Sequence, residues 1–262
     1  MAGSLANPLR ALARAIPLTV AMVVALAPAA ARAAEERLAV AAAIDGHSLR
    51  LEDGRIVRLA GIIAPDALAP AERAMAEAAR RALHAMAAGR VATALDPAGR
   101  RDRHRRLLVH LRDGEGNWIQ GEMLRAGLAR VWTQPDAAER ADEMLALESQ
   151  ARAAGKGIWA LPHFAIKTPE TAADAMDRFQ IVEATVADVA RVRGTVYLNT
   201  GPDWRTDFTA RIERPALRLF ADAGRDVEAL KGRRIRVRGW LRLYNGPFVD
   251  VTHPQQVEVL DP

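Results

Sequence analysis

Short segments rich in hydrophobic residues, separated by turn residues, dominate the first part of the chain. Residues 38–43, 48–52 and 55–60 are predicted as three strands, and residues 48–52 alternate between polar and hydrophobic side chains. Asp53 and Gly54 lie between the second and third segments, and an Asp-Gly pair in that position favours a hairpin turn. The pattern therefore predicts a sheet built from consecutive hairpins.

The spacing of hydrophobic residues then changes from the period of a strand to that of a helix. Pro70 favours the start of a helix and Gly89 favours its end, so a helix is predicted between them. Residues 91–95 and 106–112 follow as two further strands, with an arginine-rich loop between them. Three strands, a helix and two strands in this order match a five-stranded OB barrel.

A second all-β unit follows a change in composition. Residues 164–177 are polar and rich in alanine, and we interpret them as a linker. Beyond it, strands are predicted at residues 181–189, 195–199, 207–212, 234–242 and 248–252, with an irregular or helical segment at 215–230. This order again fits an OB-like barrel, so the predicted fold class is mainly β with helices. The expected domains are residues 34–163 and 178–262.

The second unit contains aromatic and arginine residues that allow two interpretations. They are Tyr197, Trp204, Phe208, Trp240 and Tyr244, with Arg205, Arg236, Arg238 and Arg242. They would form a stacking and cationic surface for single-stranded nucleic acid, or they would fill and solvate a small barrel. Alternation within residues 234–238 places the arginines on one face of a half-buried strand, which favours the second interpretation. His253 is expected at the surface or in a turn.

The N-terminal segment has the features of a secretory signal peptide. Arg10 and Arg14 precede an apolar run at residues 15–27, and the small residues Ala31 and Ala33 provide a cleavage site near Ala33. Residues 1–33 are therefore expected to direct export to the periplasm or the medium, and the alternative is an uncleaved anchor. They hold three arginines and no acidic residue, so their removal lowers the formal charge from +5 to +2. The charge of the mature protein is weak evidence for a nucleic-acid partner.

The chain contains no cysteine. This excludes disulfide bonds, a thiol nucleophile and a cysteine-ligated zinc site. The stability of the fold must therefore come from burial of hydrophobic side chains.

Three segments carry a resemblance to a known family. Residues 44–51 contain Asp-Gly-His-Ser, residues 58–66 read Arg-Leu-Ala-Gly-Ile-Ile-Ala-Pro-Asp, and residues 102–108 read Asp-Arg-His-Arg-Arg-Leu-Leu. They resemble the active-site strands of the thermonuclease (staphylococcal nuclease-like) family. Residues 117–129 and 137–159 are similar to the second and last helices of that family. The second unit looks like a C-terminal domain that accompanies some exported bacterial members.

The resemblance implies an altered catalytic site. In the family two aspartates bind calcium, and at these positions this chain has His47 and Ile63. Calcium prefers carboxylate oxygens, so imidazole is a poor replacement and an aliphatic side chain is none. The two arginines of the family fall on Arg58 and Arg106, which suit phosphate. The general-base glutamate falls on Asp66, whose carboxylate is one methylene group shorter.

The remaining residues of the motifs leave alternatives open. Arg103 and His104 are possible substrate-binding residues, although the family has a tyrosine at the position of His104. Trp132 would replace the base-stacking tyrosines only if it were exposed, and we expect it to be buried. The family calcium site is expected to be lost, and no other cofactor is expected. A weaker alternative is a transition-metal or acid–base site formed by Asp45, His47 and Asp66, with His104 as a further candidate.

The function expected from these observations is binding. An exported thermonuclease-like protein with an eroded calcium site, a pseudoenzyme, would bind nucleic acid or another phosphate-bearing ligand through Arg58 and Arg106. The first alternative is an active phosphodiesterase that uses a metal other than calcium, or none, with Asp66 as the base. The second alternative is an envelope scaffold that binds proteins.

Overall fold

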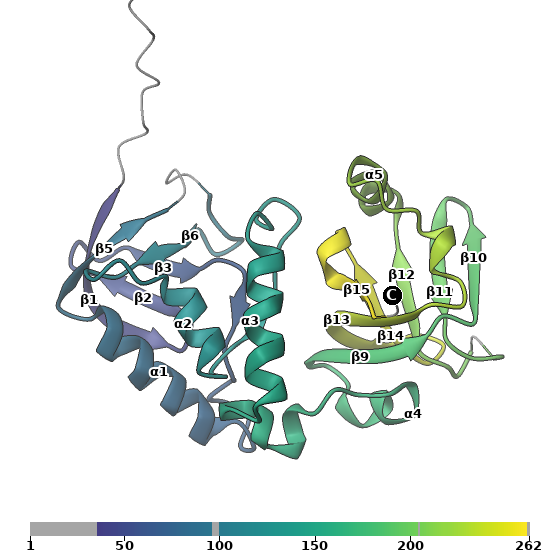
Figure 1. Ribbon diagram of the computed structural model, residues 1–262, viewed down its shortest axis with the longest axis horizontal. Coiled ribbons are helices and arrows are strands. Elements are labelled where there is room, and N and C mark those ends of the chain that lie inside the picture. The colour runs from purple at the N-terminus through teal and green to yellow at the C-terminus, as the bar shows by residue number, and fades with distance from the viewer. Residues whose placement is uncertain (1–35, 96–99, 204, 261–262) are drawn as a thin grey trace, which may run out of the picture. The chain divides into compact units, whose positions relative to one another are not determined.

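In the computed structural model, strands form the first barrel and helix α1 (Arg73–Ala87) packs against it (Figure 1). The structure describes residues 36–95, 100–203 and 205–260, so the predicted signal peptide and Trp204 lie outside the described residues. The strands of this part are β1 (Arg37–Asp45), β2 (Ser48–Leu51), β3 (Ile56–Leu59), β4 (Ile62–Ile63), β5 (Arg90–Ala94), β6 (Leu107–Val109), β7 (Leu111–Arg112) and β8 (Arg130–Val131). The helices are α1 (Arg73–Ala87), α2 (Ile119–Arg125) and α3 (Ala141–Ala153).

The first sheet closes into a barrel with five strand positions. Its order is β6-β3-β2-β1-β5-β7, in which β6 pairs with β3 in parallel and β7 pairs with β5 in antiparallel register. Only His110 separates β6 from β7, so the two are halves of one strand that joins both edges of the sheet. The two strands predicted after the helix therefore take the places that an OB barrel requires.

Helix α1 covers the first barrel with one apolar face. The buried positions are Ala76, Ala79, Leu83 and Ala87, which follow the spacing of three and four residues that places side chains on one side of a helix. Three of these four residues are alanines, and Ala79 and Leu83 reach the core that is formed inside β1, β2 and β3. The confirmed helix begins three residues after Pro70.

The second barrel repeats the same topology. Its strands are β9 (Phe179–Thr185), β10 (Asp188–Val192), β11 (Thr195–Asn199), β12 (Thr209–Ile212), β13 (Arg234–Leu243), β14 (Pro247–Val251) and β15 (Val257–Val259), with α5 (Arg214–Asp222) before β13. The order is β10-β11-β12-β14-β13-β15, and β9 returns to pair with β13. Strand β12 pairs with β14 in parallel, as β3 pairs with β6 in the first barrel. The sequence pattern did not predict β15.

The segment between the barrels contributes to the second core. Residues 164–177 include α4 (Pro169–Ala172) and a short 3-10 helix at Ala173–Ala175. Ala172 and Ala175 are buried in the second hydrophobic core together with Val182 and Phe208. The predicted linker is therefore partly packed structure, and residues 34–262 form one unit.

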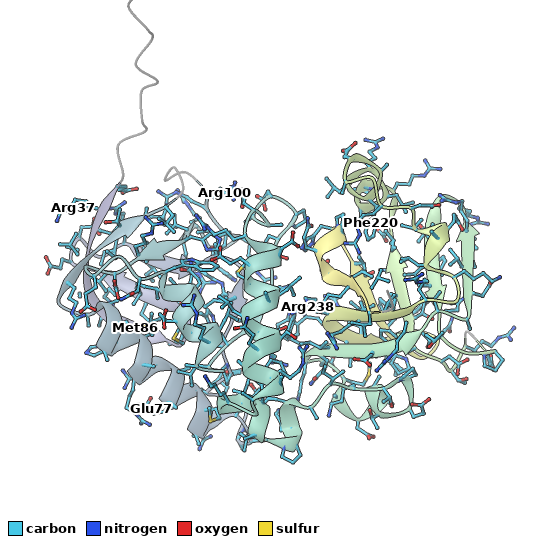
Figure 2. The ribbon with its side chains drawn as sticks, viewed as in Figure 1. Arg37, Glu77, Met86, Arg100, Phe220 and Arg238 are labelled. Carbon is cyan, nitrogen blue, oxygen red and sulfur yellow. The ribbon has the colours of Figure 1, made fainter. Side chains whose placement is uncertain are left out.

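Two residues of the second barrel correct the expectations from sequence. Arg238 was expected on a solvated face, but its side chain is completely buried and forms ion pairs with Glu148 of α3 and with Glu258. His253 was expected at the surface, but it is 1% exposed and lies 2.7 Å from the hydroxyl of Thr133. Both residues meet groups from the first barrel, and Figure 2 shows Arg238 beside α3. Alternation identifies the face of a strand but not what covers that face.

Gly127, which ends the segment after α2, provides a test of backbone packing. Its φ is +65°, and a Cβ atom there would overlap the backbone oxygen of Lys156. We expect Gly127→Ala to lower the free energy of unfolding by about 2–3 kcal/mol, because a left-handed conformation costs an alanine about 1–2 kcal/mol before any overlap. Urea denaturation measures the change. Gly54→Ala is the matched control, since Gly54 has a φ of +84° and open space around it. Equal losses in the two variants would contradict the prediction.

Candidate phosphate-binding site

The ribbon of β4 and β8 holds the surroundings of Arg58 in place. Ile62 pairs with Val131 across these two strands, and the backbone N–H of Trp132 donates a 2.8 Å hydrogen bond to the carbonyl of Gly61. Arg58, in β3, is buried and donates from Nη2 to the carbonyl of Ile62 at 3.3 Å. Its guanidinium carbon lies 5.9 Å from the centre of the Trp132 ring. Ile62 of β4 and Trp132, which follows β8, therefore orient the guanidinium group of Arg58.

Arg106 reaches the same site from the arginine-rich turn. Strand β3 pairs with β6, in which Leu108 is the partner of Arg58 and lies two residues after Arg106. The side chain of Asp102 holds Arg106 in a fork, with 2.7 Å from Nε and 2.6 Å from Nη2 to the same carboxylate oxygen. Burial opposes ionisation of Asp102, but the hydrogen bonds from Arg106 outweigh it and lower the pKa of that carboxyl group.

The two predicted arginines lie near enough to affect each other. Burial lowers the pKa of Arg58 to about 10, and the positive charge of Arg106 acts in the same direction. The negative charges of Asp45 and Asp102 oppose the shift. Burial also raises the pKa of Asp45 against the opposing charges of Arg58 and Arg106. The structure thus brings Asp45, Arg58, Asp102 and Arg106 into one electrostatic group.

His47 and Ile63 occupy the two positions at which the resemblance places calcium ligands. The Nδ1 atom of His47 accepts a 3.1 Å hydrogen bond from the backbone N–H of Ala64. Because an accepting nitrogen carries no proton, Nδ1 is not a donor to Asp45, whose oxygen lies 3.6 Å away. Ile63 lies in β4 with a half-buried side chain. Its side chain has no atom that binds a cation.

Asp66 lies in the exposed loop that follows β4. One of its carboxylate oxygens accepts a 2.9 Å hydrogen bond from the N–H of Leu68, which is the local bonding of a turn. Its own N–H donates to Glu72 at 2.8 Å. Glu72 is buried, and its other oxygen lies 2.9 Å from Nε2 of His163. Glu72 was not predicted from sequence, because no motif marks it; it directly precedes α1 and bonds to the loop before that helix.

Arg103 and His104 lie at the exposed tip of the arginine-rich turn. The Nε atom of Arg103 is 3.0 Å from Nε2 of His104, and the N–H of His104 donates to Asp102. Arg105 adopts a left-handed φ of 64° that reverses the chain. Asp102 therefore organises this turn as well as Arg106.

Trp132 connects the arginine site to the second barrel. Its side chain is half-buried, whereas the sequence predicted a buried residue. Its ring meets the ring of Trp240 edge-to-face at 6.1 Å and lies 5.9 Å from the ring of Phe179. Trp240 is 42% exposed. Sequence alone gave no signal for this cluster, because its members come from both barrels.

Residues 36–95, 100–203 and 205–260 contain no group of three or more histidine, cysteine, aspartate or glutamate side chains that is placed to hold a metal ion. Within the same ranges, none of the helices has the length and hydrophobicity needed to cross a membrane.

Comparison with known proteins agrees with this geometry. Residues 56–161 match the model of the family described as staphylococcal nuclease homologue. The chain thus carries a thermonuclease-like OB domain, which includes Arg58, Asp66 and Arg106, followed by a second β-barrel domain. A search of curated proteins found no match to the chain.

Proposed function

We propose that this protein is an exported thermonuclease-like protein that binds nucleic acid or another phosphate-bearing ligand through Arg58 and Arg106 and does not carry out calcium-dependent hydrolysis. The observation that carries the proposal is that Arg58 is buried without an ion-pair partner in the part of the chain that the structure describes. Among the described residues this buried guanidinium group forms no ion pair, and its hydrogen bond goes to a neutral carbonyl. The negative charges of Asp45 and Asp102 act on Arg58, but neither carboxylate forms an ion pair with it, so an anion in direct contact would stabilise this buried charge.

The nearby Arg106 strengthens the case for an anion. Two guanidinium groups that raise each other's energy are both relieved by a ligand with several negative oxygens, and planar guanidinium forks match phosphate. Asp102 holds Arg106 in place and leaves its remaining N–H groups for a ligand. The staphylococcal nuclease family match supports a nucleic-acid polymer as the source of the phosphate.

The residues at the calcium positions do not fit calcium. Ile63 offers no oxygen, and the Nδ1 atom of His47 is engaged by the backbone of Ala64. Asp45 supplies a single nearby carboxylate, whose raised pKa makes its charged form less favourable. Calcium takes six to eight oxygen ligands, so this set of side chains is too small. The exposed Asp66 is engaged by its own turn, which weakens its case as a general base.

Replacement of both arginines tests the proposal. We expect the double variant Arg58→Ala, Arg106→Ala to lose at least about tenfold in affinity for fluorescent single-stranded DNA or RNA, because two charge-assisted contacts to phosphate are removed. The dependence of affinity on salt should weaken as well, since fewer counter-ions are released. Fluorescence anisotropy at several salt concentrations measures both effects.

The control and the hydrolysis assay separate the alternatives. Arg81→Ala removes one exposed positive charge from α1 and should leave affinity nearly unchanged. Salt-independent or absent nucleic-acid binding by the unmodified protein would contradict the proposal and favour the scaffold. The same nucleic acids are incubated with calcium, manganese, zinc or EDTA, and cleavage that the double variant loses would establish a phosphodiesterase instead.

A further inference from the structure

The outward face of the second barrel contains a hollow of about 350 Å³. Strands β11 and β12 pair so that Tyr197 lies beside Arg211 and Asn199 lies beside Thr209. In β14, Phe248 is the cross-strand partner of Thr209. Their neighbours along the strands, such as Leu198 and Ala210, point into the core. The hairpin turn that joins β13 to β14 adds Tyr244 and Asn245 to the lining.

The position of the hollow corresponds to a general property of this topology. Strands β11 and β12 are the second and third strands of the second barrel, if β9 and β10 count as one bent strand, and the turn at Asn245 joins the fourth to the fifth. In OB folds these two strands and this turn form the surface that binds oligonucleotides and oligosaccharides. The first barrel has its paired arginines elsewhere, so the hollow is a separate site.

The lining provides flat surfaces rather than free charges. The guanidinium carbon of Arg211 lies 5.1 Å from the centre of the Phe248 ring, and Tyr244 meets that ring edge-to-face at 6.4 Å. The Nε atom of Arg211 donates to Asp250 at 2.6 Å, and this bond raises the pKa of Arg211. The charge of Arg211 is therefore balanced. Among the described residues that line the hollow there is no aspartate, glutamate, histidine or lysine, which makes a metal ion or an amine a poor ligand.

Hydrogen-bonding groups and cations are placed around these flat surfaces. Asn199 and Asn245 bring amide groups to the lining, and an amide both donates and accepts. The side-chain oxygen of Asn199 already accepts a hydrogen bond from the hydroxyl of Thr209. Arg242 is the cross-strand partner of Phe248, and its exposed side chain lies on the same outward face. Arg193, in the exposed turn after β10, directly follows Val192, which lines the hollow.

We propose that this hollow binds a nucleobase of a single-stranded nucleic acid. Tyr244 and Phe248 provide stacking surfaces, the two amides meet the polar edge of the base, and Arg242 meets the adjoining phosphate. Bases of any sequence have flat faces, so such a site is tolerant of sequence. An oligosaccharide is the less favoured ligand, because its many hydroxyl groups need acceptors and the lining has no carboxylate. This inference does not depend on the function proposed for Arg58 and Arg106.

A comparison of two probes isolates the contribution of the bases. The full chain is titrated against a fluorescent DNA single strand of about 12 nucleotides, within the site sizes of OB folds, and against an abasic strand of the same length. We expect tighter binding of the strand that has bases. Tyr244→Ala should reduce that preference by about five- to a hundredfold, since a base–aromatic stack has a large effect on affinity. Tyr244 is 69% exposed, so its removal leaves no cavity in the core.

A neighbouring residue provides the matched control. Leu243 is 72% exposed and adjoins Tyr244, but it does not line the hollow, so Leu243→Ala should retain the preference for bases. The proposal is overturned if the protein binds both strands equally, or if Tyr244→Ala retains the preference. It is also overturned if chitotetraose displaces the strand from the unmodified protein but not from Tyr244→Ala, because the site would then be a glycan site.

The paired arginines are tested in the same titration. Arg58→Ala with Arg106→Ala should lower affinity for both strands alike and leave the ratio between them unchanged. Loss of the ratio in Tyr244→Ala alone supports the hollow even if the arginine variant has no effect. Loss of affinity in the arginine variant alone, with an unchanged ratio in Tyr244→Ala, overturns the hollow and leaves the first site standing.

Discussion

Replacement of Arg238 by methionine is expected to lower the free energy of unfolding by about 3–5 kcal/mol, the usual cost of removing one partner of a buried ion pair. Arg238 is 0% exposed and bonds to both oxygens of Glu148, at 3.2 and 2.9 Å. Burial alone would lower the pKa of Arg238, but the charges of Glu148 and Glu258 outweigh it and raise that pKa. Without Arg238, Glu148 would be a buried carboxylate with Arg152 at 3.7 Å as its remaining ion pair.

A double-mutant cycle separates the energy of the Arg238–Glu148 ion pair from the other effects of removing the Arg238 side chain. Glu148 also accepts a 2.7 Å hydrogen bond from the N–H of Val131, and glutamine at this position would keep that bond. We therefore expect Arg238→Met with Glu148→Gln to recover much of the stability that Arg238→Met loses, because the buried carboxylate left without Arg238 is then neutral. Urea denaturation of the two single variants and the double variant measures the coupling.

An exposed ion pair provides the control. Arg191 and Glu228 lie 2.9 Å apart, and both side chains are about half exposed. Arg191→Met should cost less than about 1 kcal/mol, because solvent screens such pairs. A loss in Arg238→Met no greater than the loss in Arg191→Met would show that the buried pair does not hold the two barrels together.

The sequence predicted the two barrels because their pattern is local. Alternation, the Asp53-Gly54 turn and the spacing of residues along α1 all depend on neighbours within a few positions. Each barrel then follows from one order of strands and one helix, and the parallel pairing of β3 with β6 confirms that order. The break at His110, which divides one predicted strand into β6 and β7, changes pairing partners but not the fold.

The candidate site was predicted only in part, because some of its contacts join residues that are distant in sequence. Arg58 and Arg106 were identified by motifs, and the structure shows that their charges interact. Trp132 and Trp240 were not joined by any pattern, because they are more than a hundred residues apart and meet only through the packing of the two barrels. Arg238 and Glu148, which are 90 residues apart, also meet only through this packing. Contacts between distant elements depend on which surfaces meet, and alternation within one strand carries no information on that.

Buried His253 leads to a pH dependence of stability. It lies between the hydroxyl groups of Thr133 and Thr252, at 2.7 and 3.0 Å, and burial lowers its pKa from 6.5 to about 4. Between these values the unfolded chain binds a proton that the folded chain does not bind. The free energy of unfolding is therefore expected to fall as the pH drops from about 6.5 to about 4, by up to about 3 kcal/mol. The contribution is fully present above the unfolded pKa of this histidine.

The variant His253→Gln isolates this term from the titration of carboxylates. Glutamine has a hydrogen-bonding group of similar reach and does not titrate, so the two proteins should share every other pH-dependent contribution. Urea denaturation at pH values from 7 down to about 4 gives the difference between their free energies of unfolding. That difference should change steadily across this range in favour of the variant. A constant difference would mean that His253 titrates alike in the folded and unfolded chains, in which case its burial against Thr133 does not exclude the charged form.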